Sequence, residues 1–362
     1  MDTDGSGCGE IPNFLDSATH WSATCCPMPA FSWSSLTSLL HSACDPDLLA
    51  NTRAHRLPSF DTAQAEVWVK REDESGFGVS GTKRRKYASL LPALQAAGVE
   101  AVALIGGPRS NHVVSLVQLL RERGLQPYLF LKEDHAPARG GNRFLIDLLT
   151  GPEEIQWVPS ADWSQVVARA EAFMAGLDRP GAVIPEGGHH PGSVAGAATL
   201  AVDLHRHEAD APPFDHIFID AGTGLSASGL RGGLRLAGHA AQLHVVLMAG
   251  DAASFWAQDE QVRTWSGQVL PQPFPPPARL HLHHPPTARA FGSVNATVLA
   301  ETRRLARESG LLTDPVYTTK LFLAARRLIV EQALSGRILL IHSGGGTGLM
   351  GFASRLSGSL SP

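Results

Sequence analysis

The sequence predicts an α/β protein in which largely parallel sheets are covered by helices. From about residue 66 onward, short runs rich in β-branched and aromatic residues alternate with longer segments of helical period. This alternation favours parallel strands, because each crossover between them is usually made by a helix. The chain has 362 residues, 43% of them hydrophobic, which is enough for one large core or two ordinary ones. At this length we expect two α/β domains.

The predicted elements follow one another along the chain. The expected strands are 67–70, 101–105, 127–131, 155–158, 182–184, 216–220, 243–248 and 337–341. The expected helices are 82–97, 110–123, 142–149, 163–177, 193–207, 226–236, 295–308 and 318–334. The proline-rich stretch 271–286 is expected to be a loop or connector, because proline fits neither a helix interior nor a central strand. Residues 1–50 are expected to form an extension with one short helix at the apolar patch 33–40.

Charge and targeting signals restrict the classes of partner. Lys and Arg number 30 against 34 Asp and Glu, and the net charge of -4 provides no basic surface for nucleic acid or anionic lipid. No run approaches the roughly 18 consecutive apolar residues of a membrane-spanning helix. No Lys or Arg precedes Arg53, whereas secretory and transit signals need an early positive charge. We therefore expect a cytoplasmic protein with a small-molecule partner, and neither nucleic acid nor membrane binding.

Cysteine and histidine spacing predicts no metal site. The cysteines are Cys8, Cys25, Cys26 and Cys44, and their spacing matches no zinc pattern. We interpret them as thiols on a loose extension. The histidines at 281, 283 and 284 lack further partners of defined spacing, so we expect a solvated loop edge there.

Four junctions after predicted strands are rich in glycine and polar residues. They are 71–82, which leads into Lys-Arg-Arg-Lys at 83–86, then 106–112, 221–229 and 342–348. Ligands of open α/β sheets bind at the carboxyl ends of the strands. Backbone amides at a helix start also attract anions. We therefore expect a phosphate-binding loop, although such a loop alone is also an ordinary turn; its residues are Gly222, Thr223, Gly224, Leu225 and Ser226.

Lys83 supplies a second feature that points to a cofactor. It is one of only five lysines and stands at a predicted helix start. The helix dipole and the neighbouring cations lower the pKa of an ammonium in this position, which suits imine formation. A solvated basic first turn is the alternative. A Gly-x-Gly-x-x-Gly pattern at 346–351 is not a dinucleotide fingerprint, because only residues 352–362 follow it.

The order of these motifs resembles the pyridoxal-phosphate enzymes of the ACC deaminase and D-cysteine desulfhydrase family. The motifs that carry the resemblance lie at 70–73, 81–86, 106–112, 185–188, 222–224, 312–317 and 341–345. The resemblance implies the two-domain tryptophan synthase β type of fold, fold type II of the pyridoxal-phosphate enzymes. It implies an N-terminal extension of residues 1–50, a large cofactor-binding domain of 51–85 and 192–362, and a small inserted domain of 86–191. We also expect a homodimer.

The resemblance also implies roles for individual residues. Lys83 stands where the family holds pyridoxal 5'-phosphate covalently, and Lys86 stands where a lysine contacts the phosphate. Asn111 is implied to bond the pyridine hydroxyl, and it belongs with Ser110 and His112 to the loop that binds the substrate carboxylate. Lys83, Ser110 and Tyr317 are the implied catalytic residues, with Tyr317 also touching substrate. Thr318 is implied to lie near the pyridine nitrogen.

Two positions separate the branches of this family. The ACC deaminases carry Gln where this chain has His112 and Glu where it has Thr318, whereas the desulfhydrase-like members carry His and Thr. The sequence therefore predicts a lyase that catalyses β-elimination from a small amino acid, most similar to D-cysteine desulfhydrase, giving pyruvate, ammonia and hydrogen sulfide. ACC deaminase and a non-catalytic cofactor-binding protein are the alternatives. Thr82, Arg109 and Leu225 depart from the family pattern, and Arg109 either anchors substrate or points to solvent.

Overall fold

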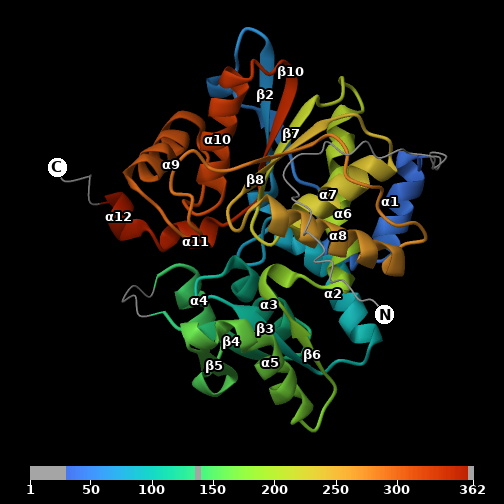
Figure 1. Ribbon diagram of the computed structural model, residues 1–362, viewed down its shortest axis with the longest axis vertical. Helices are drawn as coiled ribbons and strands as arrows, with labels where there is room; N and C mark the ends of the chain where they lie inside the picture. The colour runs from blue at the N-terminus through green and yellow to red at the C-terminus, as the bar shows by residue number, and fades with distance from the viewer. Residues whose placement is uncertain (1–29, 135–139, 358–362) are drawn as a thin grey trace, which may run out of the picture. The chain divides into compact units, whose positions relative to one another are not determined.

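The computed structural model describes residues 30–134 and 140–357, whose strands form two sheets (Figure 1). The six-stranded sheet has the order β1 (Ala54–Arg56), β2 (Ala65–Arg71), β10 (Gly336–His342), β7 (His216–Ala221), β8 (Gln242–Leu247) and β9 (Leu280–His283). The four-stranded sheet has the order β5 (Ile155–Val158), β4 (Gln126–Lys132), β3 (Ala101–Gly106) and β6 (Gly181–Ile184). All neighbouring strands are parallel except β1 and β2. The predicted parallel α/β class is therefore confirmed.

Helices cover both faces of the six-stranded sheet. Alternate residues of β10 point to opposite faces, so Ile338 and Leu340 pack with α10, while Leu339 and Ile341 pack with α6 and α7. In Figure 1, α3 and α5 lie against the four-stranded sheet. The helices are α1 (Trp33–Ser42), α2 (Thr82–Ala96), α3 (Asn111–Glu122), α4 (Asn142–Leu149), α5 (Val166–Ala175), α6 (Val194–His205), α7 (Leu225–Leu236), α8 (Ala252–Val269), α9 (Ala296–Ser309), α10 (Thr318–Glu331), α11 (Gly346–Met350) and α12 (Ala353–Ser357).

The eight predicted strands and eight predicted helices are present, but five further strands and α-helices were not predicted, namely β1, β9, α8, α11 and α12. Strand β9 lies within the stretch 271–286, so the prediction of a loop is wrong there; β9 is an edge strand, and proline beside it interrupts no central ladder. Strand β1 is a three-residue edge strand, too short to show alternation. Helix α8 buries only a few apolar side chains, so the helical period of apolar residues is weak in its sequence. Asp251 caps this helix by accepting a hydrogen bond from the Ser254 amide over 2.8 Å.

The segment that leads into β1 is packed rather than loose in its described part. Helix α1 confirms the predicted short helix, and its Leu36 and Leu40 are fully buried against α6. Cys44 is buried too, and burial raises the pKa of its thiol to about 12. The prediction of a loose extension is therefore wrong for residues 30–50. Cys8, Cys25 and Cys26 lie outside the described residues. The expected limits of a large and a small domain stay a prediction, since residues 31–362 cluster as one compact unit.

A chain of hydrogen-bonded histidines crosses strands β7, β8 and β9. Nδ1 of His216 lies 3.0 Å from Nε2 of His244, and Nδ1 of His244 lies 3.0 Å from Nε2 of His283. Burial lowers the pKa of His244 to about 3. The expectation of a solvated edge is therefore wrong for His283. Within the described ranges, no group of three His, Cys, Asp or Glu side chains is arranged to hold a metal ion.

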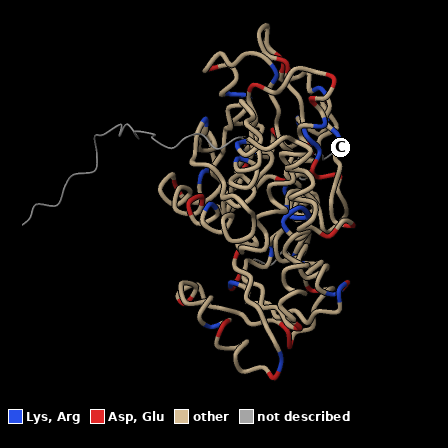
Figure 2. Tube along the Cα trace, turned by 90° about the vertical axis from the view of Figure 1, so that its right-hand side faces the viewer, with Lys and Arg blue, Asp and Glu red and all other residues tan. Residues whose placement is uncertain are grey.

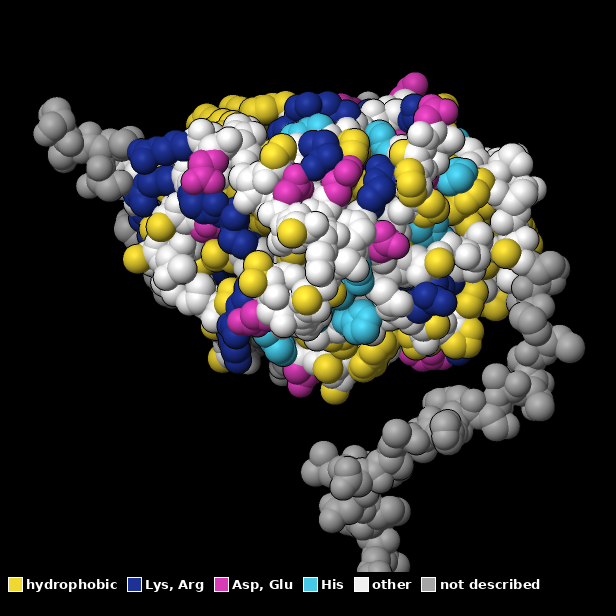
Figure 3. Space-filling view, turned by 90° about the horizontal axis from the view of Figure 1, so that it is seen from above, with side chains coloured by type: hydrophobic (Ala, Val, Ile, Leu, Met, Phe, Trp, Pro, Cys, Tyr) yellow, Lys and Arg dark blue, Asp and Glu magenta, His cyan; other side chains and the backbone are white. Residues whose placement is uncertain are grey.

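Lys and Arg residues are interspersed with Asp and Glu residues along the chain trace (Figure 2). On the face drawn in Figure 3, Lys and Arg side chains lie close to Asp and Glu side chains, with histidines among them. In the part of the chain that the structure describes, no helix has the length and apolar character needed to cross a bilayer.

Candidate active site

Helix α2 begins beside the end of β10, and this contact positions Lys83. Gly81 precedes the helix with φ +71°, and a Cβ there would stand 2.0 Å from the carbonyl oxygen of Ser343. Glycine is required because a side chain would strain the backbone and collide with this oxygen. The amide of Thr82 donates to the same oxygen over 3.1 Å. The first turn of α2 is therefore fixed against the carboxyl end of β10.

Lys83 is half-buried, and its amine has no bonded partner within the described structure. Its Nζ lies 5.8 Å from the ring centroid of Tyr317 and, among the described residues, makes no hydrogen bond or ion pair. Burial lowers the pKa of Lys83, while the carboxylates of Asp220 and Asp314 oppose the shift. A lysine that loses its proton readily can form a covalent bond with a carbonyl and can accept a proton. The site therefore presents the amine that the sequence predicts.

Lys86 lies one helical turn further along α2 and is also buried. Its Nζ donates to the carbonyl oxygen of Gly187 over 2.8 Å. Burial and the nearby charge of Lys83 lower the pKa of Lys86 to about 7. The Gly187 backbone touches Thr223, because a Cβ on Gly187 would stand 2.3 Å from the Thr223 hydroxyl. Lys86 is thus placed beside the loop predicted to bind phosphate.

The glycine loop after β7 has the conformation of a helix start that can hold an anion. Gly224 has φ +80° and caps α7, whose first amides have no partner within the helix. Ser226 is held toward α2 by a 3.3 Å hydrogen bond to the Thr82 hydroxyl. The side chain of Leu225 is fully buried in the core, so only its backbone is available to a ligand. Gly222 lies against Tyr317, with 3.4 Å between a Cβ position on Gly222 and the phenol ring.

The second helix start at the site is that of α3. The Ser110 hydroxyl caps it by accepting from the amides of His112 and Val113 over 3.1 and 3.4 Å. His112 bonds the Tyr87 hydroxyl through Nδ1 over 2.8 Å, and its buried Nε2 has no partner in the described structure. Burial and the two active-site lysines lower the pKa of His112 to about 3, so the imidazole is neutral. A neutral His112 can bond a ligand without adding charge.

Tyr317 and Thr318 open helix α10 on the other side of Lys83. Burial and the nearby acids raise the pKa of Tyr317, which keeps its phenol protonated. The Thr318 hydroxyl accepts from the amide of Asp314 over 2.8 Å and lies 3.3 Å from its carbonyl oxygen. The Thr318 hydroxyl therefore already bonds the backbone of the preceding turn. A hydrogen bond from this hydroxyl to a pyridine nitrogen would compete with its contact to the Asp314 carbonyl oxygen.

The residues at this site fit pyridoxal phosphate. Lys83 supplies the amine, the start of α7 with Lys86 supplies an anion site, and the start of α3 supplies a second one. Three of the buried polar atoms that have no partner in the described ranges lie at this site, namely Nε2 of His112, Oδ1 of Asp220 and Oδ2 of Asp314. Such atoms are costly unless a ligand pairs with them.

A comparison with protein families agrees with this geometry. The family model described as "Pyridoxal-phosphate dependent enzyme" matches residues 46–344. The chain belongs to this family. The predicted cofactor, the predicted family and the tryptophan synthase β type of fold are therefore confirmed.

Individual relatives of this pyridoxal-phosphate enzyme share about a quarter of its residues. The chain is 25% identical over 295 residues to a putative 1-aminocyclopropane-1-carboxylate deaminase of Pyrococcus horikoshii, covering 81% of this chain and 88% of the relative. It is 27% identical over 297 residues to the D-cysteine desulfhydrase of Yersinia pestis, covering 79% and 88%. The crystal structure of an ACC deaminase homologue superposes with a TM-score of 0.79 at 24% identity, covering 89% of this chain and 98% of that one.

The sequence did not single out four polar residues that complete the site of this pyridoxal-phosphate enzyme. Asp220 and Ser343 end neighbouring strands β7 and β10, and Asp314 lies in the turn before α10. Asn142 starts α4, and its Nδ2 donates to Oδ1 of Asn111 over 2.7 Å while its Oδ1 accepts from Thr347 over 2.6 Å. A polar residue at the end of a buried strand was the available signal for Asp220; Asn142 had none.

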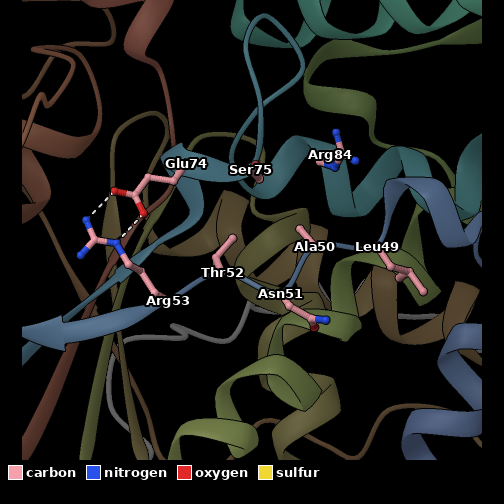
Figure 4. A pocket seen from close by; sticks show the side chains of 8 residues that line it. All are labelled: Leu49, Ala50, Asn51, Thr52, Arg53, Glu74, Ser75 and Arg84. Carbon is pink, nitrogen blue, oxygen red and sulfur yellow. Dashed lines mark hydrogen bonds and ion pairs between the residues drawn. The ribbon is translucent and has the colours of Figure 1, made fainter.

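Two further features lie apart from Lys83. Arg109 is about half exposed and forms an ion pair with Asp134 at 3.2 Å. A surface pocket of about 380 Å³ is lined by the 49–53 segment with Glu74, Ser75 and Arg84 (Figure 4). Lys83 does not line it, and the Arg53–Glu74 ion pair at its edge is exposed. The unpartnered atoms near Lys83, rather than this pocket, define the candidate active site.

Proposed function

We propose that this enzyme is a lyase that eliminates the β-substituent of a small amino acid, most similar to D-cysteine desulfhydrase, and releases pyruvate and ammonia. The observation that supports it is the half-buried Lys83, which has no bonded partner in the described structure and lies near two helix starts, each able to hold an anion. Relatives named deaminase and desulfhydrase agree with elimination chemistry. When bound, pyridoxal phosphate supplies an electron sink for the charge that forms when a C–H bond at Cα breaks.

The roles of the residues follow from their positions. Lys83 is proposed to hold the cofactor and then to take the proton from the substrate Cα, since its burial favours the neutral amine. The amides at the start of α7, with Lys86, would bind the phosphate. Asn111 would bond the pyridine hydroxyl, held in place by Asn142. Ser110, His112 and the amides of α3 would bind the substrate carboxylate.

Tyr317 and Thr318 complete the proposed site. The phenol of Tyr317 stays protonated and lies over the amine, so it can orient Lys83 or donate to a leaving group. Thr318 can share a hydrogen bond with the pyridine nitrogen but cannot stabilise a pyridinium by charge. This arrangement favours elimination of a good leaving group over opening of an unactivated cyclopropane ring.

A substrate comparison tests the proposal. Turnover of D-cysteine or β-chloro-D-alanine to pyruvate should exceed turnover of ACC to 2-oxobutanoate by at least about tenfold, which is about 1.4 kcal/mol of transition-state stabilisation. Equal or faster release of 2-oxobutanoate would restore the ACC deaminase alternative. Intact cofactor absorbance without turnover of any of these compounds would favour the non-catalytic alternative.

We also propose a homodimer that works in the cytoplasm on a small amino-acid substrate. Light scattering of the purified enzyme tests the oligomeric state, and a monomer at micromolar concentration would contradict it. Fractionation of the source cells tests the location.

A further inference from the structure

Two carboxyl groups near Lys83, each with one buried oxygen, have no use in the proposed roles above. Asp314 is 3% exposed, and its Oδ1 accepts from the amides of Val316 and Tyr317 over 2.7 and 3.2 Å. Its Oδ2, like Oδ1 of Asp220, is buried without a partner in the described structure. We call Asp220 and Asp314 the acidic pair. Each member offers an unused acceptor in a place from which water is excluded.

Backbone contacts place the acidic pair around the start of α2. Gly345 packs on Asp314, since a Cβ on Gly345 would stand 2.5 Å from Oδ2. The preceding Gly344 touches Gly81, two residues before Lys83, with 2.9 Å between its own Cβ position and the Gly81 Cα. On the other side, the Ser343 side chain lies close enough to the Asp220 carboxylate to oppose the rise of its pKa. Both acids therefore lie beside residues 343–345, which touch Gly81 just before Lys83.

The charge balance at this site is incomplete. The lowered pKa of Lys83 favours its neutral amine, and the phosphate and the substrate carboxylate each add negative charge. Lys86 lies near Asp220 but is proposed to serve the phosphate, and Lys320 lies near Asp314 with its Nζ donating to the carbonyl oxygen of Ala288 over 2.8 Å. Neither lysine bonds the acidic pair, and a cation that did so would stabilise it, because unpaired carboxylates in a buried site are strongly unfavourable. Burial raises the pKa of Asp314 to about 6, against the pull of the two amides, which is consistent with a carboxylate that lacks such a partner.

We propose that the acidic pair recognises a cationic β-substituent, so that the enzyme acts on β-amino amino acids such as 2,3-diaminopropanoate. This inference rests on the proposed β-elimination and names its substrate class. Asp220 Oδ1 and Asp314 Oδ2 would accept hydrogen bonds from the β-ammonium group. These charge-assisted bonds would satisfy the two orphaned acceptors and neutralise the site at the same time.

The chemistry balances without any further reagent. Lys83 takes the proton from Cα, the electron pair of that bond forms the Cα–Cβ double bond, and the Cβ–N bond breaks with its electrons leaving on nitrogen as ammonia. Hydrolysis of the remaining enamine with one water gives pyruvate and a second ammonia. The β-amine can leave as ammonia only if it is protonated beforehand, because an unprotonated amine would depart as an amide ion. The acidic pair would keep it protonated.

The holoenzyme tests this inference directly. Both enantiomers of 2,3-diaminopropanoate, β-chloroalanine and cysteine are compared by kcat/KM for pyruvate formation. We expect wild type to prefer a 2,3-diaminopropanoate over the matching cysteine at least tenfold. Asp220→Asn and Asp314→Asn should each lower that ratio at least tenfold, whereas the exposed control Asp210→Asn should keep the wild-type ratio.

A binding comparison adds a readout that does not depend on turnover. 2,4-Diaminobutanoate carries a cation but no β-leaving group, and 2-aminobutanoate is its uncharged counterpart. Titration of each into the holoenzyme is followed by the absorbance of the bound cofactor. We expect the diamino acid to bind at least tenfold more tightly, and each variant of the acidic pair to remove that difference.

The outcomes separate the two proposals. If cysteine is preferred, and the Asn variants change neither the kcat/KM ratio nor the difference in binding, the acidic pair has no role in recognition. The proposed β-elimination is then still supported. If no β-substituted amino acid gives pyruvate, the proposed function fails and the binding comparison alone decides about the acidic pair. Equal binding of the two butanoates by wild type would overturn the inference even if one variant failed to fold.

Discussion

Two buried groups of charged side chains adjoin the first turns of α2, and they differ in how fully their atoms are paired. In one group, Arg85 bonds Glu72 over 2.6 Å and Asp203 over 2.5 Å, and Lys70 bonds Asp203 over 2.6 Å. We call Lys70, Glu72, Arg85 and Asp203 the paired cluster. In the acidic pair, each carboxylate keeps a buried oxygen without a partner in the described structure.

The difference separates residues that hold the fold from residues that await a ligand. The paired cluster contains two cations and two anions and ties β2, α2 and α6 to one another. The acidic pair lies near Lys83, Lys86 and Lys320, but among the described residues no hydrogen bond or ion pair joins either carboxylate to these lysines. Burial alone therefore does not distinguish structural from functional charge here, whereas completeness of pairing does.

The largest expected effect is that of removing the amine itself. Lys83→Ala should abolish covalent attachment of the cofactor and lower kcat/KM for elimination at least about a thousandfold, because the variant lacks both the anchor and the base. Borohydride reduction followed by peptide mapping should place the cofactor label on Lys83 in wild type. The half-buried Lys132→Ala serves as control, and a label on Lys70, Lys132 or Lys320 instead would refute the assignment.

Breaking the paired cluster should cost folding stability rather than chemistry. Asp203→Asn leaves Lys70 and Arg85 with less countercharge in a buried place, so the free energy of unfolding should fall by about 3–5 kcal/mol. Urea unfolding measures this, with the exposed pair Asp162–Arg169 as comparison, where Asp162→Asn should cost less than about 1 kcal/mol. A loss below about 1 kcal/mol for Asp203→Asn would show that the cluster is dispensable.

Adding a carboxylate to the anion site should have an effect of intermediate size. Gly224→Asp places negative charge at the start of α7, where the phosphate is proposed to bind, and also forces a side chain onto φ +80°. Cofactor affinity should fall at least about a hundredfold, which is about 2.7 kcal/mol. Gly310→Asp, at a positive-φ helix end with no neighbours within 4 Å, is the matched control for backbone strain. Normal cofactor content in folded Gly224→Asp would refute the phosphate site.

An Asp to Asn change in the acidic pair should raise the free energy of unfolding, whereas the same change in the paired cluster should lower it. The pKa of Asp314 is about 6 in the folded protein and about 3.9 when unfolded, so the folded state binds more protons between pH 4 and 6. Stability of the cofactor-free protein should therefore fall as pH rises through this window, with the full penalty present above pH 6. Asp314→Asn should remove that slope and raise the free energy of unfolding at pH 7 by about 1–3 kcal/mol. Unfolding at pH 4 and pH 7 measures it, and a destabilised Asp314→Asn at pH 7 would contradict the comparison.

The sequence predicts well those features that local rules determine. Strand β5 and helix α4 have the predicted bounds, because glycine and proline mark their ends. The amine of Lys83 and the loop at Gly224 could also be predicted, since each stands at a strand to helix junction. Helix α8 was missed because most of its residues are polar or exposed, which hides the helical period.

The remaining features depend on contacts between distant residues. Asn142 bonds Asn111, 31 residues away, and Thr347, 205 residues away, which no local pattern encodes. The unpaired oxygens of Asp220 and Asp314 become visible only when every neighbour has been placed. Residue types could indicate where a ligand binds, but only the packed chain shows which acceptors are left for it.

The hydrogen-bonded histidines on β7, β8 and β9 must all adopt the same tautomer. A neutral imidazole has one N–H, so His244 can donate to one neighbour only if it accepts from the other. The three rings must then point their protons in the same direction along the chain, and reversing one requires reversing all three. A proton added at His244 would make both of its nitrogens donors, so one neighbour would have to turn its own N–H away. The edge strand β9 is thus tied to β7 by a directional bond pattern that behaves as a single unit.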